Sequence, residues 1–163
     1  MKTLEDLFEH QLKDLYSAEK LLIVALPEMA KNANDDRLVE AFEDHLEETK
    51  DQKERLESIC RVLNISPGGE TCKAMEGLIK EAKSFIKEAS DDEVMDAGLI
   101  AEAQRVEHYE IAGYGTAVRY AKELGHTNIA EQLQASLDEE YDADNLLDKL
   151  AEKRLNRKAI NKE

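Results

Sequence analysis

The sequence predicts an all-α protein, a four-helix bundle with a short crossover helix between the second and third long helices. Only two prolines and seven glycines interrupt its 163 residues, and these residue types are the ones least compatible with helices. Hydrophobic residues make up 42% of the chain and charged residues 36%, so the chain can form a core and is not of the disordered class. Over most of the sequence, apolar residues recur about every 3.6 positions, as in amphipathic helices.

The first two helices are expected at residues 2–31 and 35–63, on either side of a polar turn that supplies N-cap side chains. Because the turn is short, the two helices should form an antiparallel hairpin. Pro27 lies inside the first pattern and removes one backbone donor. We expect either a kink at this proline or a helix that ends one turn early.

The clearest chain break is the Ser-Pro-Gly-Gly segment at residues 66–69. The amphipathic stretch that follows, at residues 75–89, is the predicted crossover helix, which packs on the bundle and carries no chemistry. Ser90 and Glu93 have the spacing of a capping box, which predicts the start of the third long helix.

The second hairpin is expected to turn near Gly125, because glycine tolerates the left-handed dihedrals that end helices. Thr127 or Asn128 is expected to cap the last long helix. The bundle is predicted to cover residues 1–157, and the basic residues 158–163 are predicted to form a frayed tail. Two tight hairpins joined by one long connection are typical of ferritin-like bundles.

Carboxylates interrupt the apolar face of the third long helix at Glu107 and Glu110. A buried charge is costly unless it is paired or bound to a metal. Residues equally far from the turn of an antiparallel hairpin lie at equal depth, which places Glu107 level with Asp144. By the same count, Glu110 lies level with Glu140 or Tyr141.

The first hairpin also carries inward polar residues. Counting from its turn places Glu19 level with Glu48. His45 lies one turn away, level with Leu22. Each of the four long helices therefore contributes an inward acid at a matched depth, which chance placement would rarely produce.

Together these acids are untenable as bare charges in a dry core, so they must share protons or bind divalent cations. Hard oxygen ligands with one imidazole favour iron or manganese over zinc. We therefore predict two iron or manganese ions, bridged by Glu48 and by Glu110 or Glu107. The predicted metal ligands are Glu19, His45, Glu48, Glu107, Glu110, Glu140 and Asp144.

Some of these residues also have a purely structural explanation. Glu19 and Glu48 lie near the edges of their stripes, where a glutamate can be exposed, and an inward His45 can be an ordinary core histidine. His108 points about 100° away from Glu107 around the helix, which argues against a role as ligand. The tyrosines are expected to serve packing. The alternative interpretation is a non-catalytic structural or interaction bundle, whose polar layer is a hydrogen-bonded relic.

Composition disfavours other classes of function. A formal net charge of −15 disfavours nucleic-acid binding, which relies on Lys and Arg. The N-terminus lacks the apolar run of a signal peptide, and no apolar stretch of about 18 residues could span a membrane. Cys60 and Cys72 lack a CxxC spacing and are expected to be ordinary thiols. We expect a cytoplasmic protein with no nucleic-acid or membrane partner.

Five separated segments carry a resemblance to a known family. They are residues 15–20 (LYSAEK), 45–49 (HLEET), 74–79 (AMEGLI), 106–112 (VEHYEIA) and 137–140 (LDEE). In this order they resemble the YciF-type bacterial stress proteins, over nearly the whole chain. The resemblance implies a ferritin-like bundle, related in fold to rubrerythrin and often a homodimer, with a di-metal centre. It implies a stress-response role with redox handling of a small oxidant such as peroxide, and it leaves open whether the protein is an enzyme.

The ligand pattern departs from that of most ferritin-like sites, which combine one Glu from each of two helices with a Glu-x-x-His from each of the others. Here Asp51 stands three residues after Glu48, and Ala143 stands three residues after Glu140. His45 precedes its glutamate, which reverses the usual order. The centre is therefore expected to be rich in oxygen ligands and poor in histidine.

Overall fold

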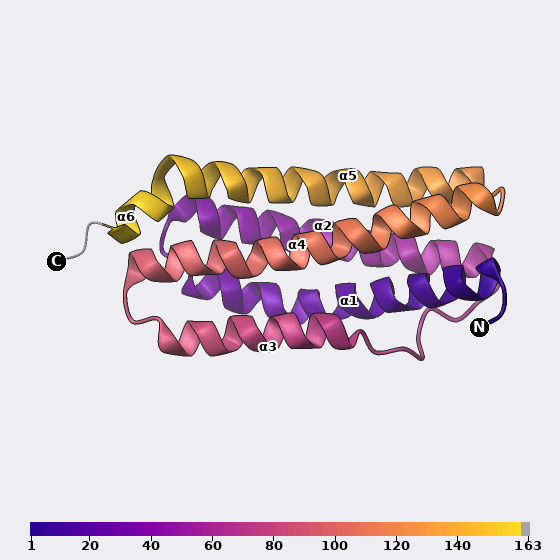
Figure 1. The fold of residues 1–163 in the computed structure, drawn as a ribbon, viewed down its shortest axis with the longest axis horizontal. Coiled ribbons are helices and arrows are strands. Elements are labelled where there is room, and N and C mark those ends of the chain that lie inside the picture. The colour runs from indigo at the N-terminus through magenta and orange to yellow at the C-terminus, as the bar shows by residue number, and fades with distance from the viewer. Residues whose placement is uncertain (161–163) are drawn as a thin grey trace.

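Every regular element in the part of the chain that the structure describes is helical, so the all-α prediction is confirmed. The structure, a computed structural model, describes residues 1–160, the side chains at positions 153 and 154 excepted. Residues 161–163 of the predicted tail lie outside this part. The helices are α1 (Leu4–Asn32), α2 (Asp36–Val62), α3 (Lys73–Glu88), α4 (Asp92–Glu123) and α5 (Thr127–Leu150), followed by a π-helical turn (Ala151–Leu155) and α6 (Asn156–Ile160) (Figure 1).

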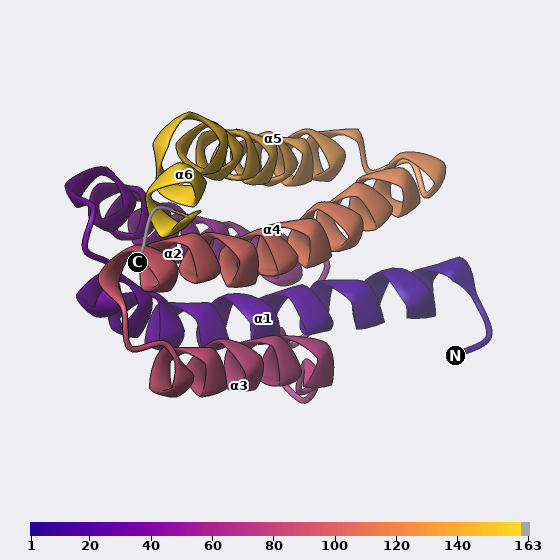
Figure 2. The same ribbon diagram turned by 60° about the vertical axis from the view of Figure 1, so that its left-hand side comes forward.

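The four long helices form the predicted bundle of two hairpins. Helices α1 and α2 pack against each other, as do α4 and α5; α1 also packs against α4, and α2 against α5. Helices α2 and α4 are therefore diagonally opposite. The crossover helix α3 lies outside this bundle, against α1 and α4 (Figures 1 and 2). This arrangement confirms the ferritin-like topology.

Helix starts follow capping chemistry, with two corrections to the sequence analysis. Asp35 caps α2 by accepting the Arg37 amide at 3.2 Å. The cap of α4 is Asp91, not Ser90; its carboxylate accepts two backbone amides, each at 3.1 Å. Helix α5 begins at Thr127 after His126, which makes no side-chain capping bond, so the cap predicted at residue 127 or 128 is wrong.

Gly125 follows a helix end, whereas Pro27 lies inside a helix. Gly125 follows the end of α4 with φ +76°, as predicted for a glycine that terminates a helix. Helix α1 continues through Pro27 to Asn32, so the alternative of an early end is wrong. Pro27 lies on the exposed side of α1, where its ring does not displace core side chains.

The hydrophobic core consists of two clusters, and the inward polar residues lie between them along the helices. On α1, Leu15 belongs to one cluster and Leu22 to the other, with Glu19 between them. The same division occurs on α2, α4 and α5, where the flanking pairs are Phe42 and Leu56, Val106 and Tyr114, and Leu147 and Leu137. The polar layer therefore sits in the middle of the bundle.

The C-terminal segment packs back onto the bundle. The π-helical turn brings Leu155 into the core, where it is fully buried. Helix α6 then continues to Ile160, across the predicted boundary at residue 157, and Lys158 Nζ lies 3.3 Å from Asp35 Oδ2. Within the described residues, no helix combines the length and the apolar character needed to cross a membrane.

Candidate metal centre

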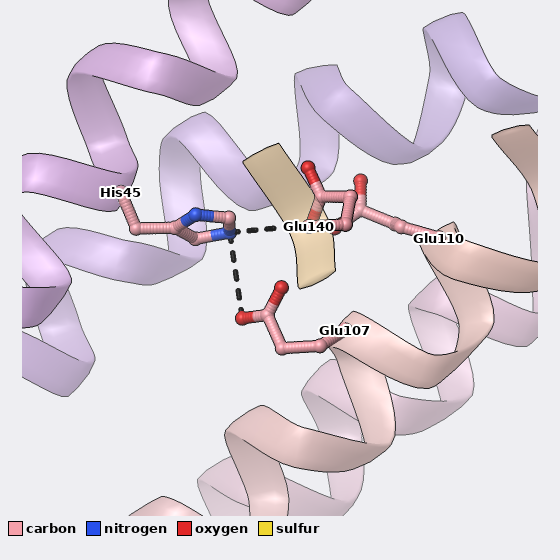
Figure 3. A group of neighbouring side chains, drawn as sticks. All are labelled: His45, Glu107, Glu110 and Glu140. Carbon is pink, nitrogen blue, oxygen red and sulfur yellow. Dashed lines mark ion pairs between the residues drawn. The ribbon is translucent and has the colours of Figure 1, made fainter. Parts of the chain in front are cut away.

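Four buried side chains from three helices converge in the middle of the bundle. His45 comes from α2, Glu107 and Glu110 from α4, and Glu140 from α5. One ligand atom from each lies within 4.8 Å of the others. Figure 3 shows His45 facing the carboxylates. Its Nε2 lies 3.5 Å from Glu107 Oε1 and 4.0 Å from Glu140 Oε2. All four residues are more than nine-tenths buried.

The fourth long helix contributes Glu19. This side chain is fully buried on α1, and the Tyr114 hydroxyl of α4 donates a hydrogen bond to its Oε1. The charge of Glu140 lies close enough to raise the pKa of the Glu19 carboxyl. Tyr114 itself packs in the core, as expected for the tyrosines, and additionally holds this carboxylate.

The structure places two of the seven predicted ligands at the rim of this cluster rather than inside it. The Glu48 side chain is 47% exposed, with Oε2 3.6 Å from His45 Nδ1. The Asp144 side chain is 20% exposed, with Oδ2 3.3 Å from His108 Nε2, and it accepts a hydrogen bond from Gln104 at 3.1 Å. His108 is 68% exposed and lies outside the group of four converging residues, as its helical position indicated.

The five buried residues carry potential metal-ligand atoms that have no hydrogen-bond partner. Seven of their side-chain nitrogen and oxygen atoms are buried and lack a hydrogen bond among the described residues. Buried polar groups are normally satisfied, and nitrogen and carboxylate-oxygen donors of this kind are metal ligands. The residues present therefore fit a metal ion. The seven atoms are Glu19 Oε2, His45 Nδ1, His45 Nε2, Glu107 Oε2, Glu110 Oε1, Glu110 Oε2 and Glu140 Oε2.

Burial and mutual repulsion shift the pKa values of the acids upward. Burial, with the charge of Glu140, raises the pKa of Glu19 to about 8. Burial also raises the pKa values of Glu107 and Glu110 well above their ordinary range. For His45, burial disfavours the charged form, but the nearby carboxylates of Glu107 and Glu48 outweigh it and raise the pKa to about 10. Without a metal, the cluster therefore retains protons at neutral pH.

A second set of polar residues supports the cluster and was missed from the sequence. Gln52 of α2 is fully buried and donates hydrogen bonds to Glu140 at 2.5 Å and to Glu139 at 3.0 Å. Arg55 pairs with both oxygens of Glu139, at 2.9 and 3.0 Å. Gln52 stands in the inward stripe of its helix, and a neutral amide at that position was the available signal.

The fold and site together define a class, a ferritin-like helical bundle with a buried histidine and carboxylate cluster. The chain belongs to the family described as "Domain of unknown function (DUF892)", which it matches over residues 3–160. It is 47% identical to protein YciF of Escherichia coli (strain K12), over 99% of this chain and 98% of that protein. The resemblance to YciF-type stress proteins is thereby confirmed.

Solved structures agree with this family. The crystal structure of the E. coli stress protein YciF matches with a TM-score of 0.90 and 44% identity, over 100% of both chains. The protein YcfI of Rhodopseudomonas palustris matches with a TM-score of 0.88 and 44% identity, over 91% of this chain and 94% of that one. A protein of Xanthomonas campestris pv. campestris, 22% identical over 92% of both chains with a TM-score of 0.75, shows the same fold.

Proposed function

We propose that this protein is a cytoplasmic stress-response metalloprotein, whose buried cluster binds two iron or manganese ions. The single observation that carries this proposal is a set of seven buried nitrogen and oxygen atoms without hydrogen-bond partners. Five residues on all four long helices contribute them. An apolar or fully hydrogen-bonded core would not leave such a set in one place. The relationship to a stress protein supports the physiological setting.

The charge of the cluster supports two divalent ions. Four buried carboxylates carry −4 when ionised, and His45, which must lose its proton to bind a metal ion, then adds no charge. Arg55, which is linked to the cluster through Glu139 and Gln52, is already paired with Glu139. Two divalent cations supply +4 and neutralise the layer, whereas the metal-free layer must hold protons to remain buried.

The donor types favour iron or manganese, because carboxylates with a single imidazole suit hard divalent ions. His45, Glu107, Glu110 and Glu140 would hold the first ion. For the second ion, Glu19 inside the core and Glu48 and Asp144 at the rim are the remaining candidate ligands. Bound by these residues, either metal would supply electrons to a small oxidant such as peroxide, which is the redox role we propose.

A second candidate function has an observation in its favour. Tyr114 and Gln52 already donate hydrogen bonds to Glu19 and Glu140, and the raised pKa values of Glu19 and Glu107 keep protons in the layer. These contacts are compatible with a metal-free polar layer in a structural or interaction protein. The two functions differ in metal content.

The test is elemental analysis of purified protein after anaerobic loading with Fe(II) or Mn(II) and removal of excess metal. We expect two ions per chain for a di-metal centre. The Glu88→Gln variant, which alters an exposed acid on α3, serves as the control and should retain them. Wild-type protein without stoichiometric metal would contradict the proposal and leave the structural role.

The homodimer implied by the resemblance stays a prediction, which sedimentation tests directly.

A further inference from the structure

We propose that Gln52 is the positioning residue that fixes Glu140 as a single-oxygen metal ligand. The inference rests on the metal centre proposed above and assigns a role to a residue that provides no ligand of its own. It follows from the hydrogen bonds of the Gln52 amide, from the free oxygen of Glu140, and from the ion pair that supports both.

The amide of Gln52 has one defined orientation. Its Nε2 lies 2.5 Å from Glu140 Oε1 and 3.0 Å from Glu139 Oε2. The opposite orientation would point the amide oxygen at two carboxylates, of which Glu139 is ionised by its pair with Arg55 and Glu140 is ionised when it binds a metal ion, so neither would donate a proton. The NH₂ group therefore faces both acids, and one hydrogen goes to each.

This contact makes the two oxygens of Glu140 different. Oε1 is engaged by Gln52, whereas Oε2 is buried without a hydrogen bond and lies 4.0 Å from His45 Nε2. One oxygen is thus held by the protein and the other faces the cluster. A carboxylate held in this way coordinates through one oxygen. Calcium takes six to eight oxygens and often uses both oxygens of a carboxylate, so this arrangement selects against it.

The ion pair of Arg55 and Glu139 fixes the amide in turn. The two guanidinium nitrogens lie 2.9 and 3.0 Å from the two Glu139 oxygens, and the pair is largely shielded, with side chains 22% and 30% exposed. Glu139 then accepts the second hydrogen of Gln52. A chain of contacts therefore runs from the edge of the bundle to a ligand, and such supporting groups typically change metal affinity by 10–100-fold when removed.

The test compares the Gln52→Leu variant with Thr49→Val. Thr49 is another fully buried polar residue of α2, but its hydroxyl bonds within the helix to the His45 carbonyl at 2.7 Å and donates to no carboxylate. We expect Q52L to weaken Mn(II) binding by about 10–100-fold. We also expect its preference for Mn(II) over Ca(II) to fall, because Glu140 becomes free to offer both oxygens. T49V should bind Mn(II) within about threefold of wild type, a change that corresponds to less than about 1 kcal/mol.

Circular dichroism of the metal-free variants establishes that both are folded. If wild type binds Mn(II) and Q52L binds it equally well with unchanged Mn(II)/Ca(II) preference, the role of Gln52 is refuted while the metal centre stands. Equal losses in Q52L and T49V would also refute it, because any buried polar change would then have the same effect. Wild type that binds no Mn(II) would refute the metal centre and the positioning role together.

Discussion

His45 on α2 contacts Glu107 on α4 across the diagonal of the bundle, with Nε2 3.5 Å from Oε1. Both side chains are buried, and neither ring nitrogen of His45 has a hydrogen-bond partner among the described residues. The two core clusters lie on either side of this contact. Because the polar layer lies inside the bundle, a change in its protonation or metal content should change the free energy of unfolding of the whole protein.

The stability of the metal-free protein should fall as pH rises. The pKa of Glu19 is about 8 in the folded protein against an ordinary value of 4.5, so its contribution is fully present below 4.5 and is lost as pH rises through 8. The pKa of His45, about 10 against 6.5, acts in the same direction at higher pH. Thermal unfolding in a chelator from about pH 5 to about pH 9 measures this.

The general repulsion of an acidic chain also grows with pH, so the control must match the change in charge. Glu19→Gln should flatten the profile between about pH 5 and about pH 8, whereas Glu88→Gln on the surface of α3 should leave its slope unchanged. Identical slopes for the two variants would show that burial of Glu19 is not the cause.

Replacing cluster acids by glutamine should separate stability from metal binding. In Glu107→Gln with Glu140→Gln, two ionisable groups leave the core while their shapes remain. We expect the metal-free variant to gain about 1–4 kcal/mol at pH 8 or above, because buried charges have been removed. The same variant should lose its metal, as measured by elemental analysis. Retention of two ions would contradict the ligand assignment.

The Tyr114 hydroxyl should contribute to stability through Glu19. Tyr114→Phe leaves a fully buried carboxyl without its donor, and the expected loss is about 1–3 kcal/mol. Tyr16→Phe is the matched control, since the Tyr16 hydroxyl bonds the partly exposed Glu57 at 2.9 Å, and its loss should be under about 1 kcal/mol. Urea unfolding gives both values, and equal losses would argue against a special role for Tyr114.

Two helical glycines should respond oppositely to alanine. A Cβ at Gly98 would lie 1.8 Å from Phe85 Cζ, so the ring that packs α3 against α4 must move. We expect Gly98→Ala to cost about 1–2 kcal/mol net. Gly77 lies on the exposed face of α3 with nothing within 4 Å, so Gly77→Ala should gain about 0.5–1 kcal/mol. Thermal unfolding compares them; a gain in both would show that Phe85 relocates freely.

Most of the fold could be predicted because its signals are local. Apolar spacing located the long helices and the crossover helix, and the short turns near residues 34 and 125 determined the hairpins. Cap identities did not follow from the sequence, since the neighbouring residues Ser90 and Asp91 both offer suitable oxygens and only the path of the chain selects one. The turn back at Leu155 depends on contacts with the finished bundle.

The sequence by itself determined that inward acids stand at a matched depth on four helices, because helical period and distance from a turn are properties of the chain alone. Tertiary structure decided which of them meet. Glu48 follows His45 by three positions and so lies about 60° around the helix from it, enough to leave one at the rim and bring the other inside. The roles of Gln52 and Tyr114 required contacts between helices. Such contacts depend on helix rotation and side-chain rotamers to within an ångström or two, and periodicity does not resolve them.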